Sequence, residues 1–176
     1  MLKHRKLYIL LFGLILSTPL TTNAENASTF TVKSMTVDTA SKATWGAINE
    51  CRKRGYSVAV AVVDKGGNVQ ALLRDRFAGP HTIKTAIGKA WTANSFRQST
   101  SELAGLLEEK RIPAQVANNP GALLVGGGLL IRTAGESIGA IGVSGAPPGK
   151  SERDSIDGVC AQAGIDTISE TLEFDE

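Results

Sequence analysis

The sequence predicts an α/β protein of the α+β type, a three-layer α-β-α sandwich with one antiparallel sheet of about five strands. Two observations lead to this prediction. Apolar segments of strand length occur in pairs joined by short turns, as in antiparallel hairpins. Segments with helical apolar spacing lie before, between and after these pairs. Because each face of a buried sheet must be covered, we expect helices on both sides.

The first half of the domain is expected to be a helix followed by a hairpin. Apolar residues recur at helical spacing from Val37 to Cys51, and Gly55 provides a natural C-terminal stop. The run 56–64 is almost wholly apolar, which is typical of a central strand buried on both faces. A turn with two glycines follows, and 68–75 returns as the second strand.

The second half repeats this order. Isoleucines and alanines from Ile83 to Ala93 predict a helix of about four turns, and a second short helix follows with Ser99 or Thr100 as its N-cap. Two further strands are expected over 122–132 and 136–145, with room for a third. The last helix is expected to open at Ser151.

Residues 1–24 have the pattern of a secretory signal peptide, with a basic start, an apolar run and small residues before a cut after Ala24. The alternative is an uncleaved N-terminal anchor, for which the apolar run is short. We expect a periplasmic or secreted protein. Residues 25–35 would then form a flexible N-terminal segment and 36–176 a single domain.

Charge argues against nucleic acid as the main partner. The chain has 19 basic and 17 acidic residues, and the leader removes Lys3, Arg5 and Lys6, leaving 16 basic against 17 acidic. A mature chain near neutrality lacks the positive surface that binds phosphate backbones.

The two cysteines, Cys51 and Cys160, lie on the apolar faces of the first and last predicted helices. Since an exported protein meets an oxidising environment, we expect them to form a disulfide. The alternative is two buried, inert thiols. No Cys-x-x-Cys pair or Cys/His cluster supports a structural zinc site.

Three motifs are ambiguous. The stretch 144–151, SGAPPGKS, resembles a phosphate loop, but Ser144 replaces its first glycine. The stretch around Ser144 also resembles a nucleophile elbow, but the one remaining histidine precedes the serine. We interpret both as a strand-to-helix turn. The glycines at 126–128 permit a close backbone approach or a bulge.

His81 is the only histidine left after removal of the leader, and it follows Gly79-Pro80 at the start of a predicted helix. Neutral imidazole is a common metal ligand. The residues around it, Arg76, Phe77, Thr82 and Lys84, add basic groups for carboxylates, an apolar ring and a hydroxyl. This combination suits a flat, apolar, acid-bearing ligand such as haem. In the simpler alternative, His81 only caps or packs.

Two segments resemble the GlcG/HbpS family of haem-binding proteins, which is related to the PduO C-terminal domain. They are RDRFAGPHTIKTAIGKAWTANSF at 74–96 and GGGLLIRTAGESIGAIGVSGAPPGKSERDSIDGVCAQAGI at 126–165. The resemblance extends over roughly 37–168. It implies the same sandwich, assembly into homo-oligomers, haem binding in exported members and, in some, a membrane sensor partner. Lys150 and Arg153 stand where many members are acidic, which disfavours surface iron binding.

We therefore expect an exported haem-binding protein that stores, buffers or senses haem. In that reading His81 ligates the iron, Arg76 and Lys84 pair with the propionates, and Phe77 packs on the macrocycle. One alternative is a small organic-acid binding protein, or an enzyme of unknown reaction, on the same scaffold. Another is an assembly subunit whose flat surfaces serve only oligomer contacts. Fold alone does not separate these functions.

Overall fold

The computed structural model describes residues 28–149 and 155–174. It divides the chain into two units, Met1–Val32 and Lys33–Glu176. In the first unit, the described residues 28–32 are exposed and form neither helix nor strand. The second unit contains every helix and strand that the structure describes.

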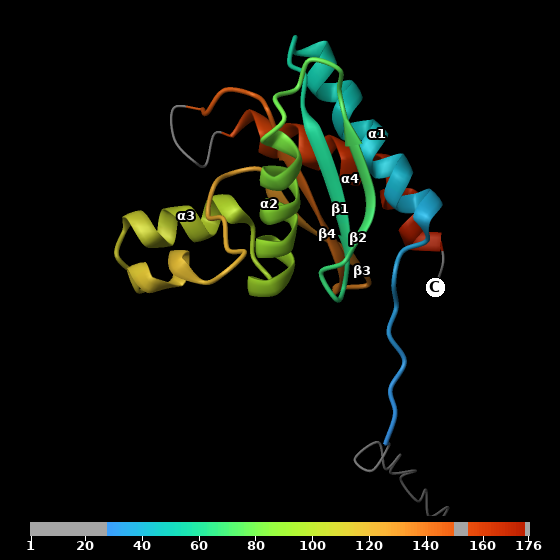
Figure 1. Ribbon diagram of the computed structural model, residues 1–176. Helices are drawn as coiled ribbons and strands as arrows, with labels where there is room; N and C mark the ends of the chain where they lie inside the picture. The colour runs from blue at the N-terminus through green and yellow to red at the C-terminus, as the bar shows by residue number, and fades with distance from the viewer. Residues whose placement is uncertain (1–27, 150–154, 175–176) are drawn as a thin grey trace, which may run out of the picture. The chain divides into compact units, whose positions relative to one another are not determined.

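The sheet of the second unit is antiparallel throughout, as predicted (Figure 1). Hairpins β1–β2 and β3–β4 lie side by side in the order β2-β1-β4-β3, so that β1 and β4 are central. The strands are β1 (Ala59–Asp64), β2 (Val69–Arg74), β3 (Gly128–Thr133) and β4 (Glu136–Ser144).

The sheet has four strands, whereas we expected about five. The third strand begins at Gly128, so residues 122–127, which we expected to belong to it, lie outside the sheet. At Gly127 the backbone adopts a positive φ of 122°, which suits glycine and departs from strand geometry. The chain before it forms a 3-10 helix, η1 (Ala114–Asn118), and turns.

Four α-helices flank the sheet: α1 (Val37–Lys53), α2 (Thr82–Phe96), α3 (Thr100–Glu108) and α4 (Ile156–Phe174). Ser99 is the N-cap of α3, and it forms a reciprocal capping box with Glu102. The expected helix start at Ser151 falls outside the described residues, and α4 begins at Ile156.

Alternate residues of β1 face the two helical layers. Val60 and Val62, together with Val58 just before the strand, belong to a large apolar core with α1 and α4, whereas Ala59 and Ala61 pack under α2. In Figure 1, α2 lies on one side of the sheet and α1 and α4 on the other. The three-layer sandwich predicted from the sequence is therefore confirmed.

Small residues let the helices approach the sheet and each other closely. A Cβ at Gly142 of β4 would overlap the carbonyl oxygen of Ala86 in α2. A Cβ at Gly164 of α4 would lie 2.6 Å from the carbonyl oxygen of Ala43 in α1. The high glycine and alanine content thus reflects tight packing of backbone on backbone.

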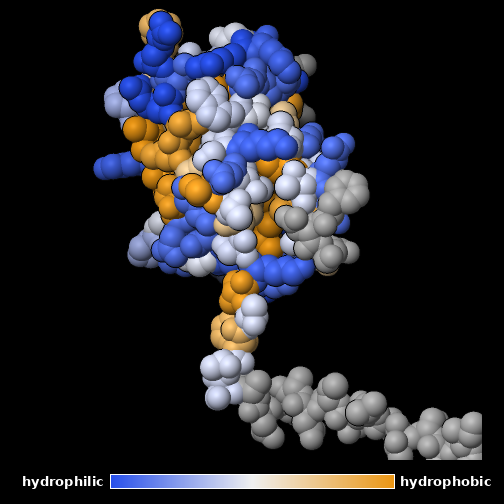
Figure 2. All heavy atoms as spheres, turned by 90° about the vertical axis from the view of Figure 1, so that its right-hand side faces the viewer, coloured by the Kyte–Doolittle hydropathy of each residue, from blue (hydrophilic) through white to orange (hydrophobic). Residues whose placement is uncertain are grey.

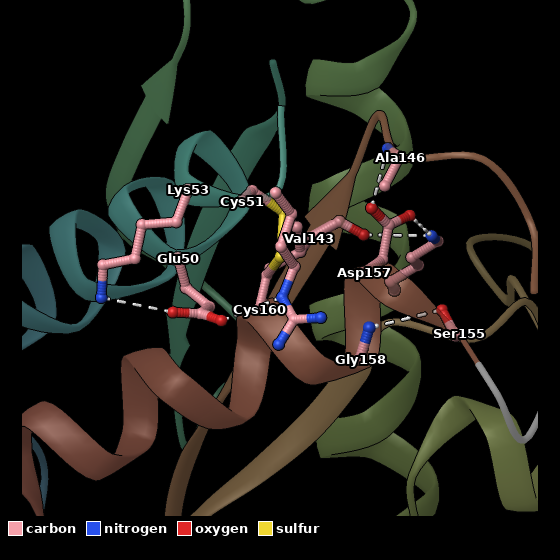
Figure 3. The surroundings of a disulfide bond; sticks show 11 residues. Glu50, Cys51, Lys53, Val143, Ala146, Ser155, Asp157, Gly158 and Cys160 are labelled. Carbon is pink, nitrogen blue, oxygen red and sulfur yellow. Dashed lines mark hydrogen bonds and ion pairs between the residues drawn. A yellow bond between two sulfur atoms is a disulfide. The ribbon is translucent and has the colours of Figure 1, made fainter. Parts of the chain in front are cut away.

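The predicted cysteine pair is bonded in the structure. Cys51 of α1 and Cys160 of α4 are both fully buried, with their Cα atoms 5.5 Å apart (Figure 3). The bond joins residues 109 apart in the sequence and fixes α1 against α4 on one face of the sheet.

Candidate functional site

A cleft of about 330 Å³ lies where the first half of α2, the end of β4 and the start of α4 meet. The loop from β4 towards α4 forms a further wall. The residues that line the cleft are His81, Thr85, Lys89, Val125, Gly126, Ser144, Gly145, Ala146, Pro147, Pro148, Gly149, Ser155 and Asp157.

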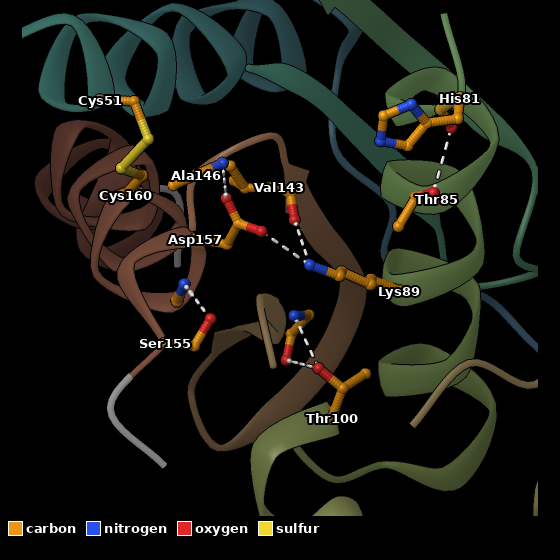
Figure 4. A network of polar contacts seen from close by, with 12 residues as sticks. Cys51, His81, Thr85, Lys89, Thr100, Val143, Ala146, Ser155, Asp157 and Cys160 are labelled. Atoms are coloured by element: carbon orange, nitrogen blue, oxygen red, sulfur yellow. Dashed lines mark hydrogen bonds and ion pairs between the residues drawn. A yellow bond between two sulfur atoms is a disulfide. The ribbon is translucent and has the colours of Figure 1, made fainter. Parts of the chain in front are cut away.

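One wall consists of His81, Thr85 and Lys89, which are spaced four residues apart and share one face of α2. His81 occupies the N-cap position, but its exposed imidazole makes no capping hydrogen bond. The hydroxyl of Thr85 donates to the His81 carbonyl oxygen over 3.0 Å. Figure 4 shows the imidazole and the Lys89 side chain projecting from the same side of α2.

Gly79 leaves room for the His81 ring. A Cβ at position 79 would lie 2.7 Å from Cε1 and 2.8 Å from Nδ1 of His81. The ring therefore packs on the glycine backbone, and a side chain there would displace it.

The floor of the cleft holds a buried ion pair (Figure 4). Lys89 is only 2% exposed, and its Nζ donates to Asp157 Oδ2 over 2.8 Å and to the Val143 carbonyl oxygen over 3.0 Å. The other carboxylate oxygen of Asp157 accepts the Ala146 N–H over 3.0 Å. The pair thus ties α2 to α4, to the end of β4 and to the loop beyond it.

Gly127 covers this pair. A Cβ at Gly127 would lie 2.7 Å from the Asp157 Cβ and 3.0 Å from Lys89 Nζ. The Val143 N–H also donates to the Gly127 carbonyl oxygen over 3.0 Å. The middle glycine of the 126–128 run is therefore a close-approach position, one of the two roles that the sequence left open.

Ser144 ends β4 and contributes a third buried polar side chain to the cleft, beside Lys89 and Asp157. It is 5% exposed. Within the described part of the chain, its hydroxyl has no hydrogen-bond partner.

The loop that leads to His81 is anchored by Asp75. Arg52 of α1 donates to Asp75 through Nε over 2.6 Å and through Nη2 over 3.0 Å. The backbone N–H of Arg76 donates to the same carboxylate over 2.9 Å. The hydrogen bonds from Arg52 lower the pKa of Asp75, and partial burial of the carboxyl opposes them.

Of the five predicted binding residues, only His81 lines the cleft. Phe77 is 82% exposed, and the Arg76 guanidinium lies 5.7 Å from its ring centroid. Thr82 is buried and donates its hydroxyl to the Gly79 carbonyl oxygen over 2.6 Å. Lys84 is exposed on α2. The structure therefore does not bring these four residues together with His81 around one cavity.

The sequence interpretation missed Lys89 and Asp157, and it treated Ser144 as part of a strand-to-helix turn without a binding role. Lys89 had a detectable signature, since it lies three residues after Ala86 on the apolar face of the helix, where a charge is rare. The partners of Lys89 could not be read from spacing, because they follow it by more than fifty residues. Among the described residues, no three His, Cys, Asp or Glu side chains gather into a metal cluster.

Comparison with known proteins assigns the chain to a family. The model of the family described as haem degrading protein HbpS-like matches residues 35–166. The chain belongs to this HbpS-like family, as the sequence motifs predicted.

Solved structures and a curated protein agree with this assignment. An HbpS double mutant from Streptomyces reticuli has a TM-score of 0.72 and 34% identity, covering 86% of this chain and 97% of its own. An uncharacterized 15.0 kDa protein of Citrobacter freundii, from the dhaT-dhaS intergenic region, is 33% identical over 64% of this chain and 77% of its own length. A PduOC:Heme complex, at 24% identity and a TM-score of 0.67, covers 77% of this chain and 96% of its own and shows the shared fold.

Proposed function

We propose that this protein binds haem at the cleft, with His81 as the iron ligand. The observation that carries the proposal is the His81 imidazole, exposed at the cleft and without a capping hydrogen bond to its own helix. A ring in this position can present a nitrogen to a metal. Membership of a family described as haem degrading supports the same ligand.

The residues present fit one edge of a haem. Val125, Ala146, Pro147 and Pro148 give the cleft apolar surface beside His81. Its volume of about 330 Å³ is at the lower end of ligand pockets, which span roughly 300–1,000 Å³. A macrocycle would therefore enter by one edge and keep the other at the surface. The exposed side chains of Arg76 and Lys84 remain our proposed partners for a propionate that lies outside the cleft.

Bound haem would supply an iron centre capable of redox chemistry. The protein would contribute the orienting contacts: Gly79 seats the His81 ring, and the Arg52–Asp75 pair anchors the loop before it. We propose that the protein stores, buffers or senses haem outside the cytoplasm. The leader pattern of residues 1–24 and the buried disulfide support export, since disulfides persist in oxidising compartments.

The proposal also includes assembly into a homo-oligomer and a membrane sensor as a partner protein. Large apolar side chains reach the surface on α1 and β2, including Val37, Trp45, Val69 and Leu72. Figure 2 shows apolar areas interrupting the polar surface on one side of the molecule. Such exposure supports a homo-oligomer, and the family resemblance supports a membrane sensor as a further partner. No helix within the described residues is long and apolar enough to span a bilayer.

The test is a haemin titration followed by absorbance. The wild type should give a saturable, shifted Soret band. His81→Ala should weaken binding and change the band, while its unfolding midpoint stays close to wild type, because the ring makes no capping bond. Lys42→Ala, on exposed α1 surface, is the matched control. An unchanged Soret band and affinity in His81→Ala would exclude His81 as the ligand.

A further inference from the structure

The floor of the cleft contains hydrogen-bonding groups that have no partner among residues 28–149 and 155–174. An ammonium group has three N–H donors, and Lys89 directs two of them to Asp157 and Val143. Across the described chain, no third acceptor accompanies these two. Buried donors are seldom left without a partner, because the lost hydration is costly.

Ser144 adds a second unused group to the same floor. It is 5% exposed and lines the cleft from the end of β4, and its hydroxyl has no hydrogen-bond partner among the residues that the structure describes. Thr85 is different, since its hydroxyl already donates to the His81 carbonyl oxygen. Lys89 and Ser144 are thus two polar side chains, each at least nine-tenths buried, that line one cavity from α2 and from the end of β4.

From this geometry we infer that the cleft floor is a subsite for a carboxylate or carbonyl oxygen, which accepts hydrogen bonds from Lys89 and Ser144. Asp157 neutralises most of the Lys89 charge, so recognition rests on directed hydrogen bonds more than on net charge. Haem presents such oxygens on its propionates, and a small organic acid presents them directly. The haem source rests on the function proposed above, whereas the small-acid source does not.

Asp157 gives the subsite its geometry. It holds Lys89 on one oxygen and the Ala146 N–H on the other, so that the donor and the loop wall are fixed together. Gly127 closes over the pair from the strand side. A floor fixed in this way is pre-organised for a ligand oxygen, which lowers the ordering cost of binding.

The first arm of the test compares haemin with haemin dimethyl ester, in which both carboxylates are blocked. A hydrogen bond to a charged group contributes about 1.5–3 kcal/mol, so wild type should bind the acid about tenfold or more tightly than the ester. Ser144→Ala should reduce that ratio severalfold. Ser95→Ala, at the other end of α2, is the matched control and should leave the ratio unchanged.

The second arm titrates acetate while the backbone amides of Gly127 and Ala146 are followed by NMR. Saturable shifts that Ser144→Ala weakens would identify a free small acid as a source. Lys89→Met/Asp157→Leu replaces the pair by apolar side chains and should abolish the response in both arms. An acid-to-ester ratio near one together with no acetate response would overturn the subsite. The proposal that His81 ligates the haem iron would be unaffected by this outcome, because the His81→Ala titration tests it separately.

Discussion

Loss of the Cys51–Cys160 disulfide should destabilise the protein by several kcal/mol, about 2–5 kcal/mol for a loop of this length. The bond closes a loop of 109 residues. In the chain-entropy model, a loop of that length restricts the unfolded chain by about 16 cal/mol/K, or about 5 kcal/mol at 25 °C. Because measured disulfides contribute about 2–4 kcal/mol, we expect the loss to lie between about 2 and 5 kcal/mol.

Urea unfolding followed by far-UV circular dichroism measures this loss. The oxidised wild type is compared with the reduced wild type and with Cys51→Ala/Cys160→Ala. Alanine is the appropriate replacement because both sulfurs are fully buried and serine would place hydroxyls in the core. The m-value should rise without the bond, since the unfolded chain becomes more extended. For a domain of this size, the thermal midpoint should fall by roughly 2–4 °C for each kcal/mol lost.

Two outcomes would refute the reasoning. Equal urea midpoints for the oxidised and reduced proteins would show that the loop closure contributes nothing to stability. A thiol assay in denaturant that finds two free thiols in protein recovered from its native compartment would show that the bond does not form there.

The other predictions concern packing, the buried pair, acid stability and assembly. Gly142→Ala should cost about 3 kcal/mol or more, because its Cβ would overlap α2; a urea midpoint near wild type would contradict this. Lys89→Met alone should lower the unfolding free energy by about 3–5 kcal/mol, because it leaves Asp157 buried and without its ion-pair partner. Lys89→Met/Asp157→Leu should have a urea midpoint close to that of wild type. Equal losses of stability in the two variants would contradict a buried ion pair. The folded-state pKa of Asp75 is lowered, so the stability that its carboxylate contributes should be complete above about pH 4 and be lost as the pH falls through the folded-state pKa. The unfolding free energy of Asp75→Asn should therefore be lower than that of wild type at neutral pH and approach it in acid. A constant difference in unfolding free energy from pH 2 to 7 would rule this out. Light scattering of the mature protein at micromolar concentration should return the mass of a homo-oligomer, and a monomer mass would contradict it.

The sequence predicted most of the sheet correctly because strand and helix periodicities are local properties. The apolar run 56–64 marked a central strand, and β1 indeed lies between β2 and β4. The glycine-containing turns identified both hairpins. The strand expected over 122–132 begins only at Gly128, because Gly127 has a positive φ and lies against the Lys89–Asp157 pair, which the apolar pattern does not reveal.

Within the candidate site, the sequence by itself showed that His81 is the one histidine beyond His4, and it predicted that His81 begins a helix behind Gly79-Pro80. It also predicted the cysteine pair, because each cysteine lies on the apolar face of a predicted helix, but it left two buried thiols as the alternative. The spacing along one helix places each cysteine on its face, and only the packing of α1 against α4 brings the two together.

Only the tertiary structure decided what accompanies His81. Residues adjacent to it in sequence, such as Phe77 and Lys84, do not line the cleft, whereas Ser144 and Asp157, more than sixty residues later, do. The physical reason is that helix α2 presents one face to the cleft, so neighbours along the chain diverge around its axis. The other walls come from strand β4 and helix α4, and their approach is set by glycine contacts and by the buried pair, which no local pattern in the sequence encodes.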